Sequence, residues 1–432
     1  MNKHGSKLRL DKSLSLYEKA IQIISGGSQT NSKRPDGYAP GAFPIYLDRG
    51  EGCRVIDVDG NEYIDYIMAL GPINLGYAYP RVNEAVREQL EKATIVSLLS
   101  PLEVELAEEI IKAVPCAEMV RFMKSGAEAT SACVRVARGY TGREKVVHCG
   151  YHGWHDTFTA SSANSKGVPQ ALQELIRSFR YNDLESLKEI LKDEADEVAC
   201  IIMEPRTPPV DGFLEGVREL ADQYGVVLIF DEIVTGFRLA LGGAQEYHGV
   251  TPDLAAFAKG ISNGLPLSAF VGKREIMEAA KDLVISTTYG GEALALAAGL
   301  ATIRELREKN VFQHTWKMGQ RLMDGCVEIG RELELNIGES GLAPIGAFTM
   351  DMGSRELTRD AWTFLLQESA KRGVLFRRGG LNFISYSHKE KDIDYTLDVC
   401  RSVMKLMKDA LQKGDLASRL ETRDIKPSFR EF

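Results

Sequence analysis

The protein has 432 residues, a length typical of two or three packed domains, which excludes a small scaffold held together by disulfides. Hydrophobic residues make up 44% of the chain and charged residues 26%, so extended disorder and a fibrous repeat are also excluded. Lys and Arg total 53 against 61 Asp and Glu, for a net charge of −8 without a long basic run. This charge argues against nucleic acid and acidic membrane surfaces as partners.

The first residues carry Lys3, Lys7 and Arg9 but no apolar run behind them, so we predict no secretory signal and a cytoplasmic location. The apolar stretch 293–303 is shorter than the roughly 20 residues of a membrane span and predicts a buried helix. The cysteines are odd in number, widely spaced and never in a Cys-x-x-Cys pair, which predicts reduced core residues. They are Cys53, Cys116, Cys133, Cys149, Cys200, Cys326 and Cys400.

The elements of the first part of the chain alternate between helical and strand patterns. Residues 13–24 have a helical pattern, and residues 53–66 form two half-apolar runs separated by Asp59-Gly60, which predicts a β-hairpin. The short run 120–123, apolar except for Arg121, is followed by a helical pattern to about residue 140 and by a second mainly apolar run, 145–149, which includes Lys145 and His148. A strand, a helix and a strand in so short a span predict that the two strands pair in parallel.

The same order recurs further along the chain, with apolar runs at 198–203 and 226–230 on either side of a helical pattern at 216–224. Strands without polar residues are buried on both faces, which indicates a layered α/β fold. After about residue 308 the chain changes to long amphipathic helices with brief strands between them, which predicts a smaller α+β domain. The predicted helices are 312–332, 359–372 and 391–412, and the charged segment 413–432 is predicted to be a surface tail.

Polar residues follow the apolar strands, at the end of a parallel sheet where ligands bind. After 120–123 the sequence Lys-Ser-Gly-Ala-Glu enters a helix, so Ser125 and the first helical N–H groups offer an anion site suited to a phosphate. The same residues also fit an ordinary serine N-cap. The segment alone leaves both interpretations open.

The run 145–149 is followed by a glycine-flanked loop, 150–156, that is rich in aromatic and imidazole side chains. The rings of Tyr151 and Trp154 can stack on a flat ligand or simply pack as an aromatic turn. His152 and His155 lack Cys or His partners at the spacing of a zinc site, so no metal is predicted.

Two charged residues directly follow the apolar runs 226–230 and 254–258. Asp231 is costly to bury without a cationic partner, which an ordinary salt bridge to an arginine would also supply. Lys259 is partly desolvated, which lowers the pKa of its amine and favours the nucleophile that forms Schiff bases. A lone lysine, however, more often extends its charge to the surface.

Together, these strand ends specify a cofactor with a phosphate, a flat ring, a ring nitrogen that pairs with a carboxylate and an aldehyde that reacts with an amine. Pyridoxal 5'-phosphate (PLP) has all four groups. The Gly-x-Gly-x-x-Gly and P-loop strings of dinucleotide and nucleotide enzymes do not occur in the chain. A binding protein without catalysis is the remaining alternative.

The sequence resembles the class III, fold type I PLP-dependent aminotransferases, and among them the glutamate-1-semialdehyde 2,1-aminomutases. The likeness extends from about Ile24 to Leu397 and rests on five motifs, at 57–66, 125–130, 151–153, 231–238 and 259–266. It implies an α/β fold whose large domain has a mainly parallel seven-stranded sheet, with a smaller α+β domain beside it. The implied boundaries are 1–75 for an N-terminal segment of the small domain, 76–308 for the PLP-binding domain and 309–432 for the rest of the small domain.

The resemblance also implies a role for each matching residue. Lys259 would form the Schiff base and move the substrate proton, and Asp231 would keep the pyridine nitrogen protonated. Tyr151 would stack on one ring face, and Val234 or Ile233 would pack on the other. The other implied cofactor residues are Ser125, Gly126 and Ala127 at the phosphate, His152, Glu204, and Thr288 from a second subunit, which implies a homodimer.

The sequence departs from the family pattern mainly on the substrate side. Ala127 stands where relatives place Thr or Ser, so one hydroxyl contact to the phosphate is missing. The aminomutase has an Arg for the substrate carboxylate where this chain has Lys33, and it has a Glu near the place of Gly380. We therefore expect a rebuilt substrate pocket, with candidate residues Lys33, Arg34, Arg377, Arg378 and Asn382.

The predicted reaction moves an amino group from a small-molecule amino donor to a carbonyl acceptor, through the Lys259 Schiff base and pyridoxamine phosphate. The alternative is the aminomutase reaction, in which the amino group migrates within one bound molecule. The changes at Lys33 and Gly380 favour transfer between two molecules.

Overall fold

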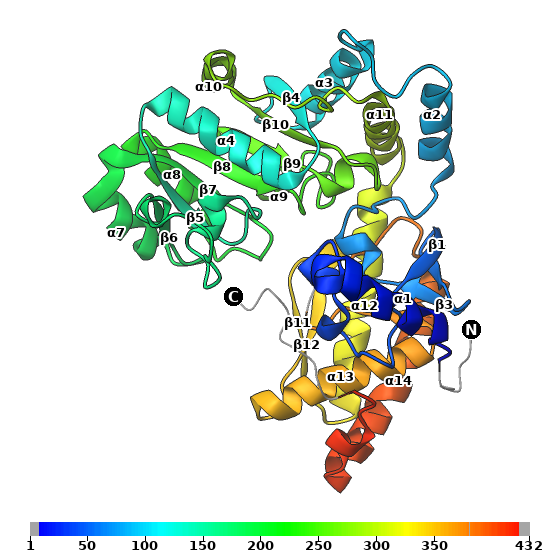
Figure 1. The fold of residues 1–432 in the computed structure, drawn as a ribbon. Helices are drawn as coiled ribbons and strands as arrows, with labels where there is room; N and C mark the ends of the chain where they lie inside the picture. Colours follow the sequence, from blue (N-terminus) through cyan, green and yellow to red (C-terminus); the bar gives the residue numbers. More distant parts are fainter. Residues whose placement is uncertain (1–7, 380, 423–432) are drawn as a thin grey trace. The chain divides into compact units, whose positions relative to one another are not determined.

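The computed structural model describes residues 8–379 and 381–422, and it divides into two compact units (Figure 1). Pro80–Phe312 form the first, here called the large unit. Met1–Tyr79 and Gln313–Phe432 form the second, here called the terminal unit, because both ends of the chain belong to it. Each unit is described by itself.

The large unit is built on a seven-stranded sheet. Its order is β4 (Met119–Met123), β10 (Ser268–Gly272), β9 (Leu254–Phe257), β8 (Val227–Glu232), β7 (Val198–Met203), β5 (Lys145–Cys149) and β6 (Ile176–Ser178). Strand β10 runs antiparallel to both of its neighbours, and the other pairs are parallel. The predicted α/β fold with a mainly parallel seven-stranded sheet is confirmed.

The prediction that the strands on either side of helix α4 (Gly126–Thr141) pair with each other is wrong. Strands β4 and β5 run in the same direction, but β10, β9, β8 and β7 lie between them. The entirely buried strands β7, β8 and β9 take the centre of the sheet, where both faces are covered, so the less buried β4 is left at an edge. Sequence analysis also missed β10, the antiparallel strand beside β4.

Helices cover both faces of this sheet. Cys200 and Ile202 of β7 pack in one apolar cluster with α4, whereas Ile201 and Met203 pack in another with α7 (Leu184–Glu194) and α8 (Phe213–Tyr224). Successive side chains of a strand point to opposite faces, so one apolar run supplies two separate layers. This arrangement explains why the central strands contain almost no polar residues before their ends.

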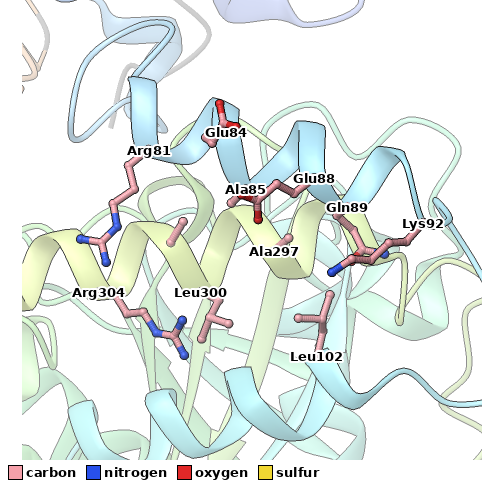
Figure 2. A pocket seen from close by; sticks show the side chains of 11 residues that line it. Arg81, Glu84, Ala85, Glu88, Gln89, Lys92, Leu102, Ala297, Leu300 and Arg304 are labelled. Carbon is pink, nitrogen blue, oxygen red and sulfur yellow. The ribbon is translucent and has the colours of Figure 1, made fainter.

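Helix α11 (Ala293–Glu308), predicted as a buried helix, packs against α2 (Pro80–Leu90) and α3 (Pro101–Ala113). A surface pocket of about 300 Å³ lies among these three helices (Figure 2). Leu102 and Leu300 contribute apolar surface to it, and Arg81 and Arg304 contribute charge. None of the predicted site residues lines this pocket. Within residues 8–379 and 381–422, no helix is long and apolar enough to cross a membrane.

The terminal unit contains a four-stranded sheet in the order β1 (Leu47–Glu51), β2 (Arg54–Asp57), β3 (Glu62–Asp65) and β13 (Val374–Leu375). Strands β2 and β3 are antiparallel and form the predicted hairpin, in which Gly60 has a φ of 89°. A second hairpin joins β11 (Ile337–Ser340) and β12 (Ala347–Met350). The helices are α1 (Asp11–Ile23), α12 (Val311–Glu332), α13 (Arg355–Lys371) and α14 (Glu390–Lys413), which confirms the predicted helices.

The prediction of a surface tail from residue 413 is wrong for the part that the structure describes. Leu416, in the short 3-10 helix Leu416–Arg419, is buried in the core of the terminal unit. The amide of Gln367 on α13 donates to the carbonyl oxygen of Arg419 at 3.0 Å. An apolar side chain next to a helix end therefore anchors the segment. Residues 423–432, the rest of the predicted tail, and Gly380 lie outside the described residues.

Candidate active site

The carboxyl ends of β4, β5, β7, β8 and β9 share one edge of the large-unit sheet, because these strands run in the same direction. This is where ligands bind in open α/β sheets. The sequence-predicted residues of the large unit, Thr288 apart, lie at these strand ends or in the segments that follow them: Ser125, Gly126, Ala127, Tyr151, His152, Glu204, Asp231, Val234 and Lys259.

Ser125 is the N-cap of α4. Its Oγ accepts from the N–H of Glu128 at 3.3 Å, and the Glu128 carboxylate accepts from the N–H of Ser125 at 2.6 Å, so the two form a capping box. Among the described residues, no group accepts from the N–H groups of Gly126 and Ala127. The N-cap interpretation is correct, and it still leaves two donors of a 16-residue helix for an anion such as a phosphate.

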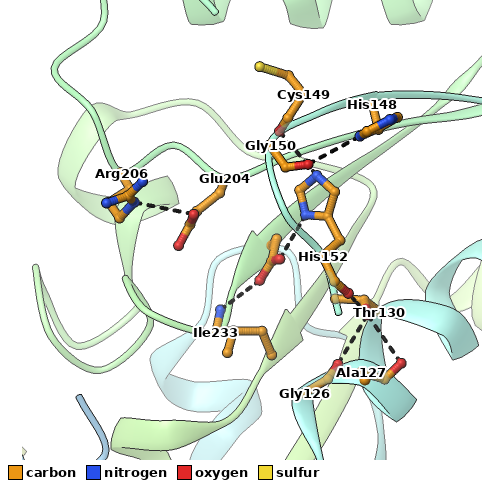
Figure 3. Close-up of polar contacts among 11 residues, drawn as sticks. Gly126, Ala127, Thr130, His148, Cys149, Gly150, His152, Glu204, Arg206 and Ile233 are labelled. Atoms are coloured by element: carbon orange, nitrogen blue, oxygen red, sulfur yellow. Dashed lines mark hydrogen bonds and ion pairs between the residues drawn. The ribbon is translucent and has the colours of Figure 1, made fainter. Parts of the chain in front are cut away.

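The loop after β5 approaches the start of α4 very closely. Gly153 has a φ of 119°, and a Cβ atom there would lie 2.8 Å from the Cβ of Ala127. The hydroxyl of Thr130 on α4 donates to the carbonyl oxygen of His152 at 2.6 Å (Figure 3). On the other side, a Cβ on Gly126 would lie 3.0 Å from Ile233, which follows β8. Small residues thus allow three segments to converge at one place.

Asp231 is 3% exposed and has two hydrogen-bond partners. Its Oδ1 accepts from the N–H of Ile233 at 3.0 Å, and its Oδ2 lies 2.8 Å from Nδ1 of His152 (Figure 3). The side-chain partner of the buried carboxylate is therefore an imidazole, not an arginine. Sequence analysis did not find this pair because 79 residues separate its members.

His148, at the end of β5, was not predicted to be part of the site. Its ring meets that of His152 edge to face, with 5.9 Å between the centroids. Its Nε2 lies 2.8 Å from the hydroxyl of Ser161 and 3.0 Å from that of Ser178, and its Nδ1 lies 3.2 Å from the carbonyl oxygen of Gly150. Burial, with a smaller contribution from His152, lowers the pKa of His148 to about 4. His148 is therefore neutral at neutral pH.

Lys259 begins the turn after β9 and has a φ of 45°. A non-glycine residue in this left-handed region costs about 1 kcal/mol or more, a strain that is typical of functional sites. In the register of β8 and β9, Asp231 lies opposite Ala256 and Glu232 opposite Phe257. Lys259 thus follows the paired end of its strand by two residues, next to β8, whose last two residues are Asp231 and Glu232.

Glu232 had no predicted role, although it follows the same apolar run as Asp231. It is fully buried, and its carboxylate accepts from the N–H groups of Ala244 at 2.8 Å and Gln245 at 3.0 Å and from the hydroxyl of Thr235. Burial raises the pKa of Glu232. These bonds fix the loop from 233 to 243, which carries the buried Val234.

The remaining predicted residues of the large unit differ in their surroundings. Tyr151 is half-buried. Glu204 pairs with Nε of Arg206 at 3.2 Å, so it already has a cationic partner in its own loop (Figure 3). Thr288 is exposed, in the turn before α11. The structure therefore places the other predicted cofactor residues at or after the carboxyl ends of the parallel strands and leaves Thr288 at the surface.

The five predicted substrate residues all belong to the terminal unit. Lys33 is exposed, and Arg34 and Arg377 are half-buried. Arg378 donates to the carbonyl oxygens of Arg359 at 3.0 Å and Tyr38 at 3.3 Å and to the hydroxyl of Thr363 at 2.8 Å. Asn382 is 3% exposed, and its side-chain oxygen has no hydrogen-bond partner among the described residues.

Comparisons with known proteins agree with this geometry. The sequence model of the family "Aminotransferase class-III" matches residues 38–389. The chain is 38% identical to a 3-aminobutyryl-CoA aminotransferase of Cloacimonas acidaminovorans, over 94% of this chain and 100% of that protein. It is 37% identical to a glutamate-1-semialdehyde 2,1-aminomutase of Syntrophobacter fumaroxidans, over 92% of this chain and 98% of that protein. The FumI protein of Sphingopyxis sp. MTA144, solved with PLP, superposes with a TM-score of 0.88 at 25% identity. The superposition covers 97% of this chain and 99% of that protein.

The fold and the strand-end site define a fold type I PLP-dependent enzyme. The chain belongs to the class-III aminotransferase family, and it is an enzyme of PLP-dependent amino transfer. The residues present fit this cofactor: two backbone donors at a helix N-terminus suit the phosphate, a buried carboxylate suits the pyridine nitrogen, and a lysine follows the neighbouring strand by two residues.

Proposed function

We propose that the protein transfers an amino group from an amino donor to a separate carbonyl acceptor, with Lys259 and Asp231 as its catalytic residues. The observation that supports this assignment is that the two residues lie at the carboxyl ends of neighbouring parallel strands: Asp231 is the second-last residue of β8, and Lys259 follows β9 by two residues. When bound, PLP supplies an aldehyde that condenses with amines and a ring that takes up the electron pair of the substrate carbon.

The chain's own residues then bind, orient and move protons. Nζ of Lys259 would hold the cofactor through its aldehyde until the donor amine takes its place, and the freed amine would then take the proton from the substrate carbon. The Asp231 carboxylate holds the proton on the pyridine nitrogen. Ser125, Gly126 and Ala127 bind the phosphate, with only a backbone donor at Ala127 because its side chain lacks a hydroxyl.

The faces of the cofactor ring are assigned to residues of two different loops. Tyr151 would pack on one face, and Val234 or Ile233 would pack on the other. Glu204 borders the cofactor, where its pair with Arg206 holds it in place. His152 contacts Asp231 rather than the ring itself.

The proposal of transfer between two molecules is supported by the relative from Cloacimonas acidaminovorans, which is named an aminotransferase. The second candidate is the aminomutase reaction, which the name of the relative from Syntrophobacter fumaroxidans supports at nearly the same identity. We assign the recognition of an acidic or polar substrate to Lys33, Arg34, Arg377 and Asn382, and a supporting role to Arg378.

The cofactor assignment is tested on the purified protein with PLP. We expect visible absorption that borohydride bleaches, with the reduced cofactor mass found on the peptide that contains Lys259. A protein that stays colourless, or a label on another lysine, contradicts the assignment. A panel of α- and β-amino donors with keto-acid acceptors then tests the reaction, because transfer needs both partners. Turnover of glutamate-1-semialdehyde without a second substrate supports the aminomutase instead.

We also propose that the active unit is a homodimer. An exposed apolar patch supports it: Leu98 is 87% exposed and Leu99 is 86% exposed. The N–H of Ala293, which follows the turn that contains Thr288, donates to the carbonyl oxygen of Thr94 at 2.8 Å. The segment 94–99, which carries both leucines, therefore begins beside that turn. Large exposed apolar patches mark interfaces. The patch consists of Ile95, Val96, Leu98, Leu99, Val104 and Tyr289.

Subunit complementation tests whether Thr288 acts in the partner's site. A Thr288→Arg protein retains Lys259, and a Lys259→Ala protein retains Thr288. If Thr288 of one subunit acts in the site of the other, a mixed dimer contains one site that has both Lys259 and Thr288. Activity should therefore return when the two variants are mixed. No recovery in mixed dimers whose formation is shown by mass contradicts the proposal. Leu98→Asp should yield monomers in light scattering.

A cytoplasmic location is proposed because all seven cysteines are free thiols. Fractionation of cells tests it, and recovery of the protein outside the cytoplasm contradicts it.

A further inference from the structure

We infer that Arg206 binds an oxyanion of the substrate, a carboxylate or a phosphate, at the carboxyl edge of the large-unit sheet. The inference rests on the proposed function and extends it, because the substrate residues predicted from the sequence all belong to the terminal unit. Arg206 supplies a cation within the unit that carries Lys259 and Asp231.

The strand register places Arg206 near the proposed cofactor site. Strand β7 ends at Met203, which lies opposite Phe230 of the parallel strand β8. The next residues of the two strands, Glu204 and Asp231, are therefore at the same level of the sheet. Arg206 follows Glu204 by two residues, at the edge where open α/β sheets bind their ligands.

Glu204 holds the guanidinium of Arg206 by one nitrogen and leaves the other two for a ligand. Its Oε2 accepts from Nε of Arg206 at 3.2 Å (Figure 3). In the part of the chain that the structure describes, no group accepts a hydrogen bond from Nη1 or Nη2 of Arg206. Paired N–H groups of a guanidinium match the oxygens of a carboxylate or a phosphate. Glu204 is thus the positioning residue, and Arg206 is the residue that binds the anion.

Partial burial distinguishes this ion pair from an ordinary surface pair. The Arg206 side chain is 25% exposed and that of Glu204 is 11% exposed. Charged hydrogen bonds are stronger where less water surrounds them. Arg180, in the loop after β6, is a contrasting case: its side chain is 77% exposed, and both its Nε and its Nη2 face Asp183.

The loop that carries Arg206 is fixed by the residues after β6. The Tyr181 hydroxyl donates to the carbonyl oxygen of Thr207 at 2.8 Å, and the Asn182 amide donates to that of Pro208 at 3.2 Å. The side-chain oxygen of Asn182 accepts from a further backbone N–H of the loop at 2.9 Å. A loop held in one conformation loses little entropy when its arginine binds a ligand.

Calorimetry on the PLP-loaded protein tests the inference with two unreactive anions. Glutarate represents a carboxylate and propyl phosphate represents a phosphate, and the tighter of the two identifies the oxyanion. We expect the wild-type protein to bind at least one of them, and Arg206→Gln to bind it at least about 10-fold more weakly. Arg206→Lys should also bind it more weakly, because an ammonium group cannot form paired bonds. Binding of neither anion, or equal binding by Arg206→Gln and the wild type, overturns the inference.

Two further variants separate anion binding from a structural role of the ion pair. Arg180→Gln is the matched control in the neighbouring loop and should leave the affinity unchanged. In Glu204→Gln the amide oxygen still accepts from Nε of Arg206 but carries no charge, so the anion should bind at least about 3-fold more tightly. Weaker binding in Glu204→Gln, or a loss in Arg180→Gln as large as in Arg206→Gln, overturns the inference.

The proposed function and the inference fail in different ways. If borohydride shows no adduct at Lys259, the proposed function fails and the inference fails with it. If the adduct forms but the Arg206 variants bind the anion normally, the inference alone fails. A loss of affinity in Arg377→Ala but not in Arg206→Gln would place the anion in the terminal unit and also overturns the inference. If Arg206→Gln does not fold, Arg206→Lys and Glu204→Gln remain decisive.

Discussion

A Cβ atom on Gly153 would lie 2.8 Å from the Cβ of Ala127, so the loop after β5 and the first turn of α4 are in direct contact. Ala127 is also a position at which the family resemblance implies Thr or Ser. The contact ties the proposed phosphate site to the loop that carries Tyr151 and His152. Changes at either residue should therefore affect both parts of the site.

Gly153→Ala should destabilise the large unit and weaken PLP binding. The new side chain would be strained at a φ of 119° and would collide with Ala127, at a cost of about 1–3 kcal/mol. Denaturant unfolding and PLP titration measure the two effects. Gly167→Ala is the matched control, because its φ is 93° but no atom lies within 4 Å of the new Cβ. Equal losses in the two variants would show that steric contact is not the cause.

Lys259→Ala should keep its fold and bind PLP only noncovalently, with no turnover. The remaining contacts at Asp231 and the start of α4 still bind the cofactor, but no amine is left to take the substrate proton. Circular dichroism, PLP titration and steady-state assays check the three statements. Lys188→Ala, at an exposed lysine on α7 that pairs with Glu185, should behave like the wild type. Normal turnover in Lys259→Ala refutes the assignment.

Asp231→Asn should reduce kcat by at least about 100-fold while PLP remains bound. The uncharged amide cannot keep the pyridine nitrogen protonated, so removal of the substrate proton becomes slower. A donor deuterated at the reacting carbon should then show a larger isotope effect than in the wild type. Asp222→Asn, at an exposed carboxylate on α8 paired with Arg218, is the control. A rate near that of the wild type would contradict the proposed role.

His388→Gln should flatten the acid dependence of the stability of the terminal unit. Burial lowers the pKa of His388 to about 4 from its ordinary value of 6.5. Between pH 4 and pH 6.5 the unfolded chain therefore binds more protons than the folded chain. The free energy of unfolding has its full value above pH 6.5, and about 3 kcal/mol of it is lost as the pH falls to 4. Urea unfolding at a series of pH values measures the slope. An equally steep pH dependence of the unfolding free energy in His388→Gln would show that His388 is not its cause.

Arg377→Ala and Arg378→Ala should have different effects. The Arg378 guanidinium binds Arg359, Tyr38 and Thr363, and burial lowers its pKa to about 10. Its loss should cost about 1–3 kcal/mol of unfolding free energy, because buried acceptors lose their donors. Arg377→Ala should instead raise KM for an acidic substrate. A raised KM without loss of stability in Arg378→Ala would instead show that Arg378 binds the substrate.

The sequence alone determined, to within two residues, where β4, β5, β7, β8 and β9 of the large sheet end. An apolar run of five or six residues must be buried, so the first charged residue after it has to lie at the polar edge. Asp231 and Lys259 follow from this rule, and so does the parallel α/β class. The long amphipathic helices of the terminal unit were equally clear, because their apolar period fits a helix with one buried side.

Only the tertiary structure decided which residues are neighbours. Strand β4 pairs with β10 rather than with β5, because strands buried on both faces occupy the centre of the sheet. Asp231 pairs with His152 across 79 residues, and Arg378 binds acceptors of its own unit. Such contacts depend on the order of strands and on close packing, which local patterns do not encode.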